Sequence, residues 1–155
     1  MKRLFIILAL CFCLVAGATL GQTSGGGTVV ENDVAEAEQK LLGKHMFSLQ
    51  WVSHTKFGTA IVTRKDTGLY IKARQELDGN FVTLKGDVRV VNAREFTVTG
   101  ELVTRVSYIN GGNACVRNET FTFKATGARK YWRLQEMQNP CEPGYNLVDY
   151  VDVYF

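Results

Sequence analysis

The sequence contains few of the residues that enzymes use for chemistry. Its 155 residues include two histidines and only two prolines. His45 and His54 are nine residues apart, so they lie on opposite faces of a regular strand, a spacing that does not suit a shared metal ion. The motifs H-x-x-x-H, C-x-x-C, H-E-x-x-H and G-x-S-x-G do not occur. We therefore predict no catalytic residue, no metal site and no cofactor, and we expect a protein that is not an enzyme.

The sequence also lacks a strong charge of one sign. Its 18 basic and 15 acidic residues give a formal net charge of +3, and basic residues alternate with acidic ones along the chain. A nucleic-acid partner is therefore not expected. The hydrophobic content of 46% excludes a disordered chain, and the length fits one domain.

The first 21 residues have the three-part pattern of a secretory signal peptide. A basic start, Met1-Lys2-Arg3, precedes an almost unbroken apolar run over residues 4–15, and Ala16-Gly17-Ala18 supplies small residues. The apolar run is too short to cross a membrane comfortably. We predict cleavage after Ala18 or Gly21. The mature protein would be exported to the periplasm or the cell exterior and would not span the membrane.

Signal removal leaves two of the four cysteines, Cys115 and Cys141. In an exported protein the simplest interpretation is one disulfide, worth roughly 3–4 kcal/mol in the chain-entropy model. Two free thiols are the alternative.

The mature chain divides into three segments. Residues 22–31 contain Thr23-Ser24-Gly25-Gly26-Gly27 and are typical of a flexible tether. Residues 32–43 predict a short helix, with Asn32 or Asp33 as its cap and Gly43 as its stop. Residues 44–155 predict a single β domain.

About eight strands are indicated by alternating hydrophobicity and by Gly/Asn/Asp turns. Gly86 and Gly100 fall inside long strands and predict a bulge or a sharp bend. Long bent strands in hairpin order favour a small closed or nearly closed barrel in meander order, with a two-sheet β-sandwich as the alternative. The predicted strands cover 47–51, 59–63, 69–73, 81–91, 95–109, 114–125, 130–137 and 147–155.

The last predicted strand, residues 147–155, ends in Phe155 after alternating aromatic and aliphatic residues. In this it resembles the closing strand of bacterial outer-membrane barrels. Asp149 and Asp152, however, place a carboxylate on each face of that strand, whereas a lipid-facing strand needs an uninterrupted apolar face. An outer-membrane barrel is therefore a less favoured interpretation.

The expected architecture resembles the small lipocalin or avidin type, which suggests a binding module for a small molecule or peptide. Its ligand wall would combine aromatic rings with polar groups. The residues that we predict for this wall are Trp51, Tyr70, Trp132, Arg133 and Tyr150, with Phe96 beside them. A filled interior with no cavity would count strongly against such a binding module.

Two other functions remain open at this point. A protein-interaction or structural module of the cell envelope would use an outer face and the loops around Cys115 and Cys141, and it predicts a packed interior with an exposed aromatic patch. A hydrolase would use Glu136 with Asp149 or Asp152, and it requires those carboxylates to share a concave site.

Overall fold

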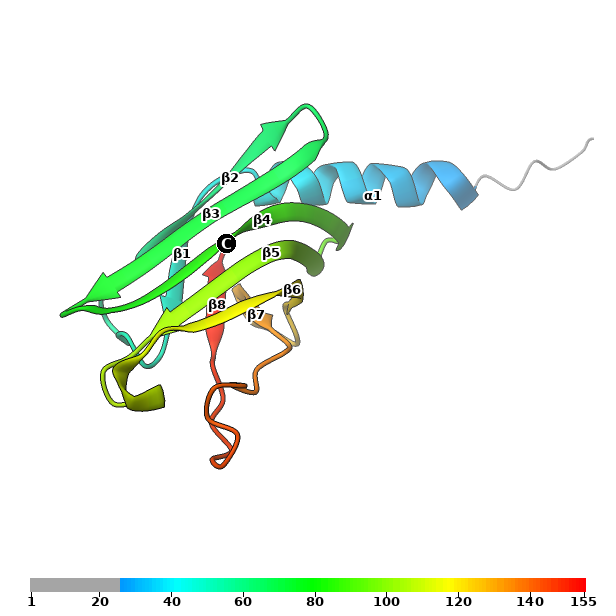
Figure 1. Ribbon diagram of the computed structural model, residues 1–155. Coiled ribbons are helices and arrows are strands. Elements are labelled where there is room, and N and C mark those ends of the chain that lie inside the picture. The colour runs from blue at the N-terminus through cyan, green and yellow to red at the C-terminus, as the bar shows by residue number, and fades with distance from the viewer. Residues whose placement is uncertain (1–25) are drawn as a thin grey trace, which may run out of the picture.

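Eight antiparallel strands close into a barrel in chain order, and one helix precedes them (Figure 1). The computed structural model describes residues 26–155, with side chains from residue 33 onward. The predicted signal peptide and the start of the predicted tether lie outside the described residues. The elements are α1 (Gly26–Leu41), β1 (Gly43–Leu49), β2 (Gly58–Lys65), β3 (Gly68–Leu77), β4 (Asn80–Asn92), β5 (Glu95–Arg105), η1 (Asn110–Gly112), β6 (Cys115–Lys124), β7 (Tyr131–Leu134) and β8 (Val151–Tyr154).

Pairing of β1 with β8 closes the sheet, which confirms the predicted barrel and excludes the open sandwich. Every other pair joins strands that are neighbours in the chain. The connections after β1, β3, β5 and β7 therefore meet at the end of the barrel away from α1, and that end carries the longest loops (Figure 1).

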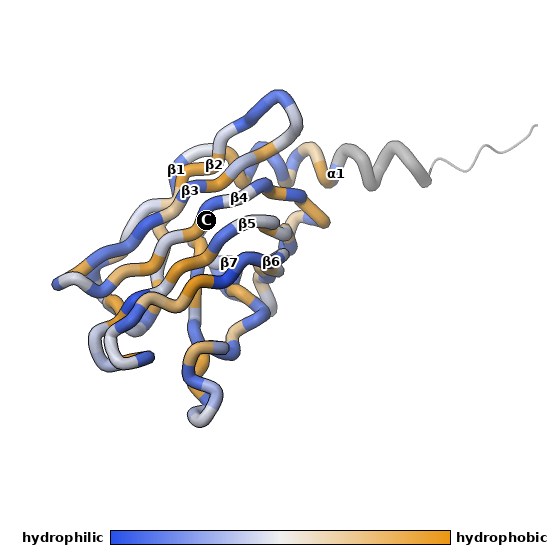
Figure 2. The backbone as a smooth tube through the Cα atoms, viewed as in Figure 1, coloured by the Kyte–Doolittle hydropathy of each residue, from blue (hydrophilic) through white to orange (hydrophobic). Residues whose placement is uncertain are grey.

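The barrel interior is filled by side chains. Hydrophobic and hydrophilic residues alternate along the strands (Figure 2), as expected when one face is buried. Twelve inward-facing side chains have no exposed surface, so no void large enough for water touches them. They are Phe47, Leu49, Ala60, Ile71, Val82, Val98, Leu102, Phe121, Phe123, Leu134, Val151 and Val153.

Gly86 and Gly100 face each other across β4 and β5 in unbroken register. Of the two predicted features, a bulge or a sharp bend, the bulge does not occur at these positions, because the register shifts between Val90 and Asn92 instead. A Cβ atom on Gly100 would lie 2.1 Å from the carbonyl oxygen of Lys85. Glycine is needed here because two curved strands approach closely (Figure 1).

Helix α1 begins at Gly26, six residues before the predicted start, so residues 26–31 of the predicted tether are helical. Once a first turn has formed, each further turn adds hydrogen bonds at little entropic cost, and the helix extends upstream. Its C-terminal end packs on the barrel through Ala37 and Leu41, which are 7% and 1% exposed. Gly43, with φ of +104°, turns the chain from the helix into β1.

His45 ties this helix to the closing strand. Its Nε2 lies 2.8 Å from the carbonyl oxygen of Leu41, and its Nδ1 lies 2.9 Å from that of Tyr154, so the ring bridges the end of α1 and the end of β8. Among the described residues no helix has the length and apolar character to cross a membrane.

The two last strands are shorter than predicted. β7 spans four residues instead of 130–137, and β8 spans four instead of 147–155. Residues 135–150 form a loop instead. The N–H of Gln135 still donates to the carbonyl oxygen of Thr122 in β6, but those of Met137, Asn139 and Asp149 bond within the loop, and that of Tyr150 bonds to a side chain. The disulfide Cys115–Cys141 is confirmed, with a Cα–Cα distance of 5.8 Å, and it fastens this loop to the start of β6.

Candidate functional site

The structure separates three of the five predicted wall residues. Trp132 is 3% exposed inside the barrel, where it packs edge-to-face against Phe96. Trp51 is half-buried at the loop end and donates its indole N–H to the carbonyl oxygen of Val148 at 3.1 Å. Tyr70 lies on the outer face of β3, with the Lys65 ammonium 3.2 Å from its ring centroid. These three residues do not form one ligand wall.

The other two predicted residues, Arg133 and Tyr150, come together on the outer face. Arg133 of β7 donates two hydrogen bonds to Asp152 of β8, Nε to Oδ1 at 2.8 Å and Nη2 to Oδ2 at 2.7 Å. Its guanidinium carbon lies 4.2 Å from the ring centroid of Tyr150 and 5.0 Å from that of Tyr131. The hydrogen bond with Asp152 is the main reason that the pKa of Arg133 is raised above its ordinary value.

A concave site of about 290 Å³, here called the wall pocket, opens beside this ion pair. It is more enclosed than the larger concave surfaces over β2–β4 and β4–β6. The pocket lies on the outside of the barrel where β1 meets β8. Its lining consists of Ser48, Gln50, Ser53, His54, Phe57, Arg133, Tyr150, Asp152 and Tyr154.

Gln75 holds the loop that forms one side of the wall pocket. This side chain is 1% exposed and faces inward at the end of β3. Its amide nitrogen donates to the carbonyl oxygens of Ser53 and Lys56, at 3.1 and 2.9 Å, and its amide oxygen accepts the N–H of Leu49. Gln75 was not among the residues predicted from the sequence. The pattern that could have indicated it is a polar residue at an inward-facing position of a strand with alternating hydrophobicity.

Gln50 places Tyr150 at the opposite side of the pocket. Its amide oxygen accepts the N–H of Tyr150 at 2.7 Å, and its amide nitrogen donates to the carbonyl oxygen of Val148 at 2.7 Å. These bonds take the place of backbone hydrogen bonds between strands at Val148 and Tyr150, which precede β8. Two amide side chains, Gln50 and Gln75, therefore fix the shape of the pocket.

The pocket offers both aromatic faces and hydroxyl groups. Phe57 and Tyr154 pack edge-to-face with ring centroids 5.3 Å apart. Ser53 Oγ accepts the N–H groups of Thr55 and Lys56, which leaves its own hydrogen free to donate. The ion pair brings no net charge, yet the carboxylate keeps spare lone pairs and the guanidinium keeps spare N–H groups. This arrangement suits binding of a polar, uncharged ligand.

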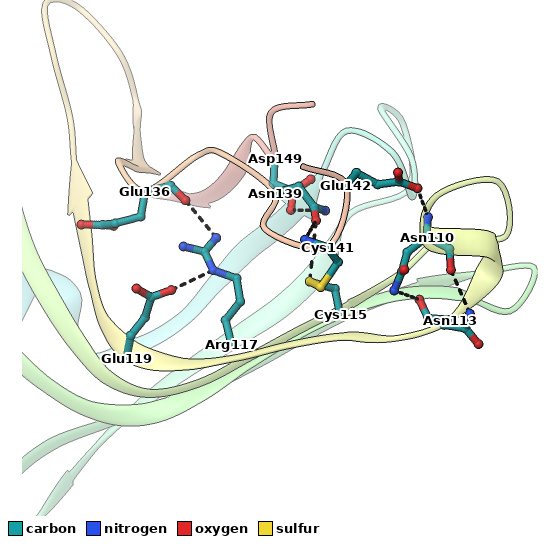
Figure 3. The surroundings of a disulfide bond; sticks show 10 residues. All are labelled: Asn110, Asn113, Cys115, Arg117, Glu119, Glu136, Asn139, Cys141, Glu142 and Asp149. Carbon is teal, nitrogen blue, oxygen red and sulfur yellow. Dashed lines mark hydrogen bonds and ion pairs between the residues drawn. A yellow bond between two sulfur atoms is a disulfide. The ribbon is translucent and has the colours of Figure 1, made fainter. Parts of the chain in front are cut away.

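The three carboxylates of the hydrolase hypothesis lie in different places. Asp152 faces outward, whereas Asp149 faces inward and is 1% exposed. Glu136 accepts the backbone N–H of Thr122 at 2.8 Å, and its carboxylate points away from Asp149 (Figure 3). The concave site shared by these carboxylates, which that hypothesis requires, does not form.

Asp149 is nonetheless an unusual carboxyl group. Its Oδ2 accepts a hydrogen bond from Asn139 at 3.0 Å, but its buried Oδ1 has no partner among the described residues. Loss of hydration is the main reason that its pKa is raised, against the opposing influence of Asn139 and Arg117.

Within residues 26–155, no group of three or more His, Cys, Asp or Glu side chains could hold a metal ion.

Comparison with known proteins identifies relatives over the whole described molecule. The model of the PM1083 family matches residues 27–155, which include α1 apart from Gly26 and all eight strands. The uncharacterized protein PM1083 of Pasteurella multocida (strain Pm70) is 43% identical over 155 residues, which cover all of this chain and 96% of that protein. No solved structure matches significantly.

Proposed function

The chain belongs to the PM1083 family, and from that premise we propose that it is an exported binding module without enzymatic activity. Its ligand lies in the wall pocket on the outside of the barrel. The ligand is a neutral ring with several hydroxyl groups, such as one sugar residue of a cell-envelope glycan.

The filled interior supports an outer site. The inward-facing side chains that fill the barrel axis touch no void of water size. A lipocalin-like ligand at the axis would have to displace several of them, and repacking a close-packed core costs more free energy than a small ligand recovers. Outer concave surfaces are therefore the places where a ligand binds without disturbing the core.

The observation that carries the proposal is the ion pair of Arg133 and Asp152 between two tyrosine rings. Because the pair is neutral overall, the pocket does not select for an anion or a cation. Hydroxyl groups of a sugar both donate and accept, so they match the spare lone pairs of Asp152 and the spare N–H groups of Arg133. The rings of Tyr150 and Phe57, 37% and 42% exposed, provide apolar faces for the C–H groups of a sugar ring.

Export is supported by two separate features. Residues 1–21 have the sequence pattern of a signal peptide, and the disulfide Cys115–Cys141 is of a kind that persists in oxidising compartments. The periplasm and the cell exterior both contain envelope glycans, so location and ligand chemistry agree.

The test is a titration followed by NMR of the backbone amides. The probes are methyl α-D-glucopyranoside, methyl α-D-galactopyranoside and N-acetyl-D-glucosamine, which share a neutral hydroxylated ring and differ in substituents. We expect at least one probe to shift the amide signals of Ser53, His54 and Tyr150 in a saturable way, while signals from β4 and β5 stay constant.

The Tyr150→Ala variant should lower the affinity for that probe about tenfold, since stacking on one aromatic face contributes about 1 kcal/mol or more. The matched control is Tyr70→Ala, which removes another outer-face tyrosine away from the wall pocket and should leave affinity unchanged. The proposal is wrong if none of the three probes shifts these signals, or if both variants lose affinity equally.

A further inference from the structure

A second concave site lies at the loop end of the barrel and is separate from the wall pocket. It has a volume of about 330 Å³ and is here called the rim pocket. Tyr108 and Tyr145 border it and are 68% and 72% exposed, whereas Ile109 is 8% exposed and forms its floor. Glu142 and Leu147 complete the lining.

We propose that the rim pocket is a docking site for a protein partner, and that it receives an arginine side chain of that partner. Two strongly exposed tyrosines over an apolar floor have the composition of an interface hot spot. Tyrosine provides much contact area with few rotatable bonds, so ordering it on binding loses little entropy.

The rim pocket is held rigid before any partner binds. The disulfide joins the loop that carries Tyr145 to the start of β6 (Figure 3). Asn139 reinforces it, because its Oδ1 accepts the N–H of Cys141 at 2.9 Å and its backbone N–H donates to the carbonyl oxygen of Leu147 at 3.0 Å. A preformed site avoids the entropic penalty of ordering a loop on binding.

The charge of the rim pocket selects a cation. Glu142 is the one charged residue in the described lining. One of its carboxylate oxygens accepts the backbone N–H of Asn110, which links the two loops (Figure 3). Its other oxygen has no hydrogen-bond partner among the described residues and is left for a ligand. A cation over the face of either tyrosine ring would also gain cation–π attraction.

Arginine fits this arrangement better than lysine. Its planar guanidinium stacks on aromatic rings and donates in parallel to a carboxylate, whereas the lysine ammonium is a compact, strongly hydrated charge. The barrel itself contains this type of contact, since Arg133 lies near the rings of Tyr131 and Tyr150 and binds Asp152. The rim pocket presents the tyrosines and the carboxylate without the arginine.

The experiment compares two small probes by NMR titration of the full mature protein. N-acetyl-arginine methylamide carries the guanidinium, and N-acetyl-citrulline methylamide has nearly the same shape without the charge. We expect the arginine probe to shift the amide signals of Tyr108, Ile109, Glu142, Tyr145 and Leu147, and to bind about fivefold more tightly than the citrulline probe, as one exposed ion pair allows.

Three variants sharpen this test. Glu142→Gln keeps an oxygen to accept the Asn110 N–H but removes the charge, so it should abolish the preference for arginine over citrulline. Tyr145→Ala should weaken both probes, and its amide spectrum reports whether the fold is kept. The control Asp87→Asn removes an exposed carboxylate of β4 and should change nothing.

Equal affinity of the two probes for the native protein would overturn the proposal, as would signal shifts outside the rim pocket. A preference for arginine that survives Glu142→Gln would do the same. Tyr150→Ala, which disables the wall pocket, should leave these titrations unchanged, so failure of one site is distinguishable from failure of the other.

Discussion

The two sides of this barrel are held together by different means. On one side β4 and β5 pair over most of their length, from Phe81 with Arg105 to Asn92 with Glu95. On the closing side β6 and β7 share two residue pairs, and β7 and β8 share three. Side chains replace the missing ladder there, through the ion pair of Arg133 and Asp152, the amides of Gln50 and Gln75, and the disulfide.

This difference shows where a small barrel can place binding groups. A complete ladder satisfies the backbone groups of β4 and β5 without side-chain help, and the concave surfaces over these strands are more open than the wall pocket. Where the ladder is short, loops and polar side chains must supply the hydrogen bonds. Both candidate pockets therefore lie on the closing side or at its loop end.

The largest expected loss of stability comes from removing the disulfide of the closing side. Replacing both Cys115 and Cys141 by serine should lower the free energy of unfolding by about 3 kcal/mol, because the unfolded chain is no longer cross-linked. Hydrogen exchange should accelerate over residues 135–150, while β4 and β5 remain the slowest strands. Urea denaturation measures the free energy of unfolding, and amide exchange followed by NMR measures the exchange rates. Loss of the difference in exchange rate between residues 135–150 and the strands β4 and β5 would contradict the contrast between the two sides.

A smaller loss is expected when the ion pair of the closing side is broken. Asp152→Ala leaves the largely buried Arg133 guanidinium without its acceptor and should lower the free energy of unfolding by about 2 kcal/mol. The matched control is Glu101→Ala, which breaks the exposed pair with Lys85 on the β4–β5 side and should change stability little. Similar losses in the two variants, measured by urea denaturation, would show that the two sides depend equally on their ion pairs.

The smallest expected effect is a pH dependence of the free energy of unfolding that is caused by Asp149. Burial raises the pKa of this carboxyl above its value in the unfolded chain, so the native state favours the protonated form. The contribution of Asp149 to the free energy of unfolding is therefore most favourable below the pKa of about 3.9 that the carboxyl has in the unfolded chain. This contribution is lost as the pH rises through the higher pKa of the native state. Asp149→Asn cannot ionise, so the stability of this variant relative to the native protein should increase from pH 4 to pH 7.

Urea denaturation of both proteins across this pH range checks the sign. Asp87→Asn, an exposed carboxylate of β4, serves as the control and should show no such increase. A difference between Asp149→Asn and the native protein that stays constant with pH would mean that the buried carboxyl ionises normally.

The side with long ladders was the easier one to predict from the sequence. Alternation over 81–91 and 95–109 indicated long strands, although β5 ends at Arg105, four residues before the predicted end. The Gly/Asn/Asp pattern also indicated the turn before β4, where Asp78 and Gly79 have positive φ. Such patterns are local, because a strand buries every second residue whatever its neighbours are. The disulfide was also predictable, since only two cysteines follow the signal pattern.

The candidate sites were predicted only in part. Arg133 and Tyr150 were assigned to one ligand wall and lie together, whereas Trp132 and Tyr70 were assigned to the same wall and lie elsewhere. The contact between Arg133 and Asp152 depends on the register of β7 against β8, and Gln75 acts through a loop about 20 residues away in the chain. Contacts of this kind leave no local period in a sequence.

The order of the strands has a consequence for how the barrel folds. Each strand pairs with the next one along the chain, so most of the sheet assembles through contacts between nearby residues, which is a fast process. The exception is the seam between β1 and β8, where Phe47 meets Val153. Closing the seam joins segments separated by nearly the whole domain and adds only three residue pairs, so we expect it to form after the hairpins. The wall pocket spans this seam, and we therefore expect the pocket to form only when the barrel closes.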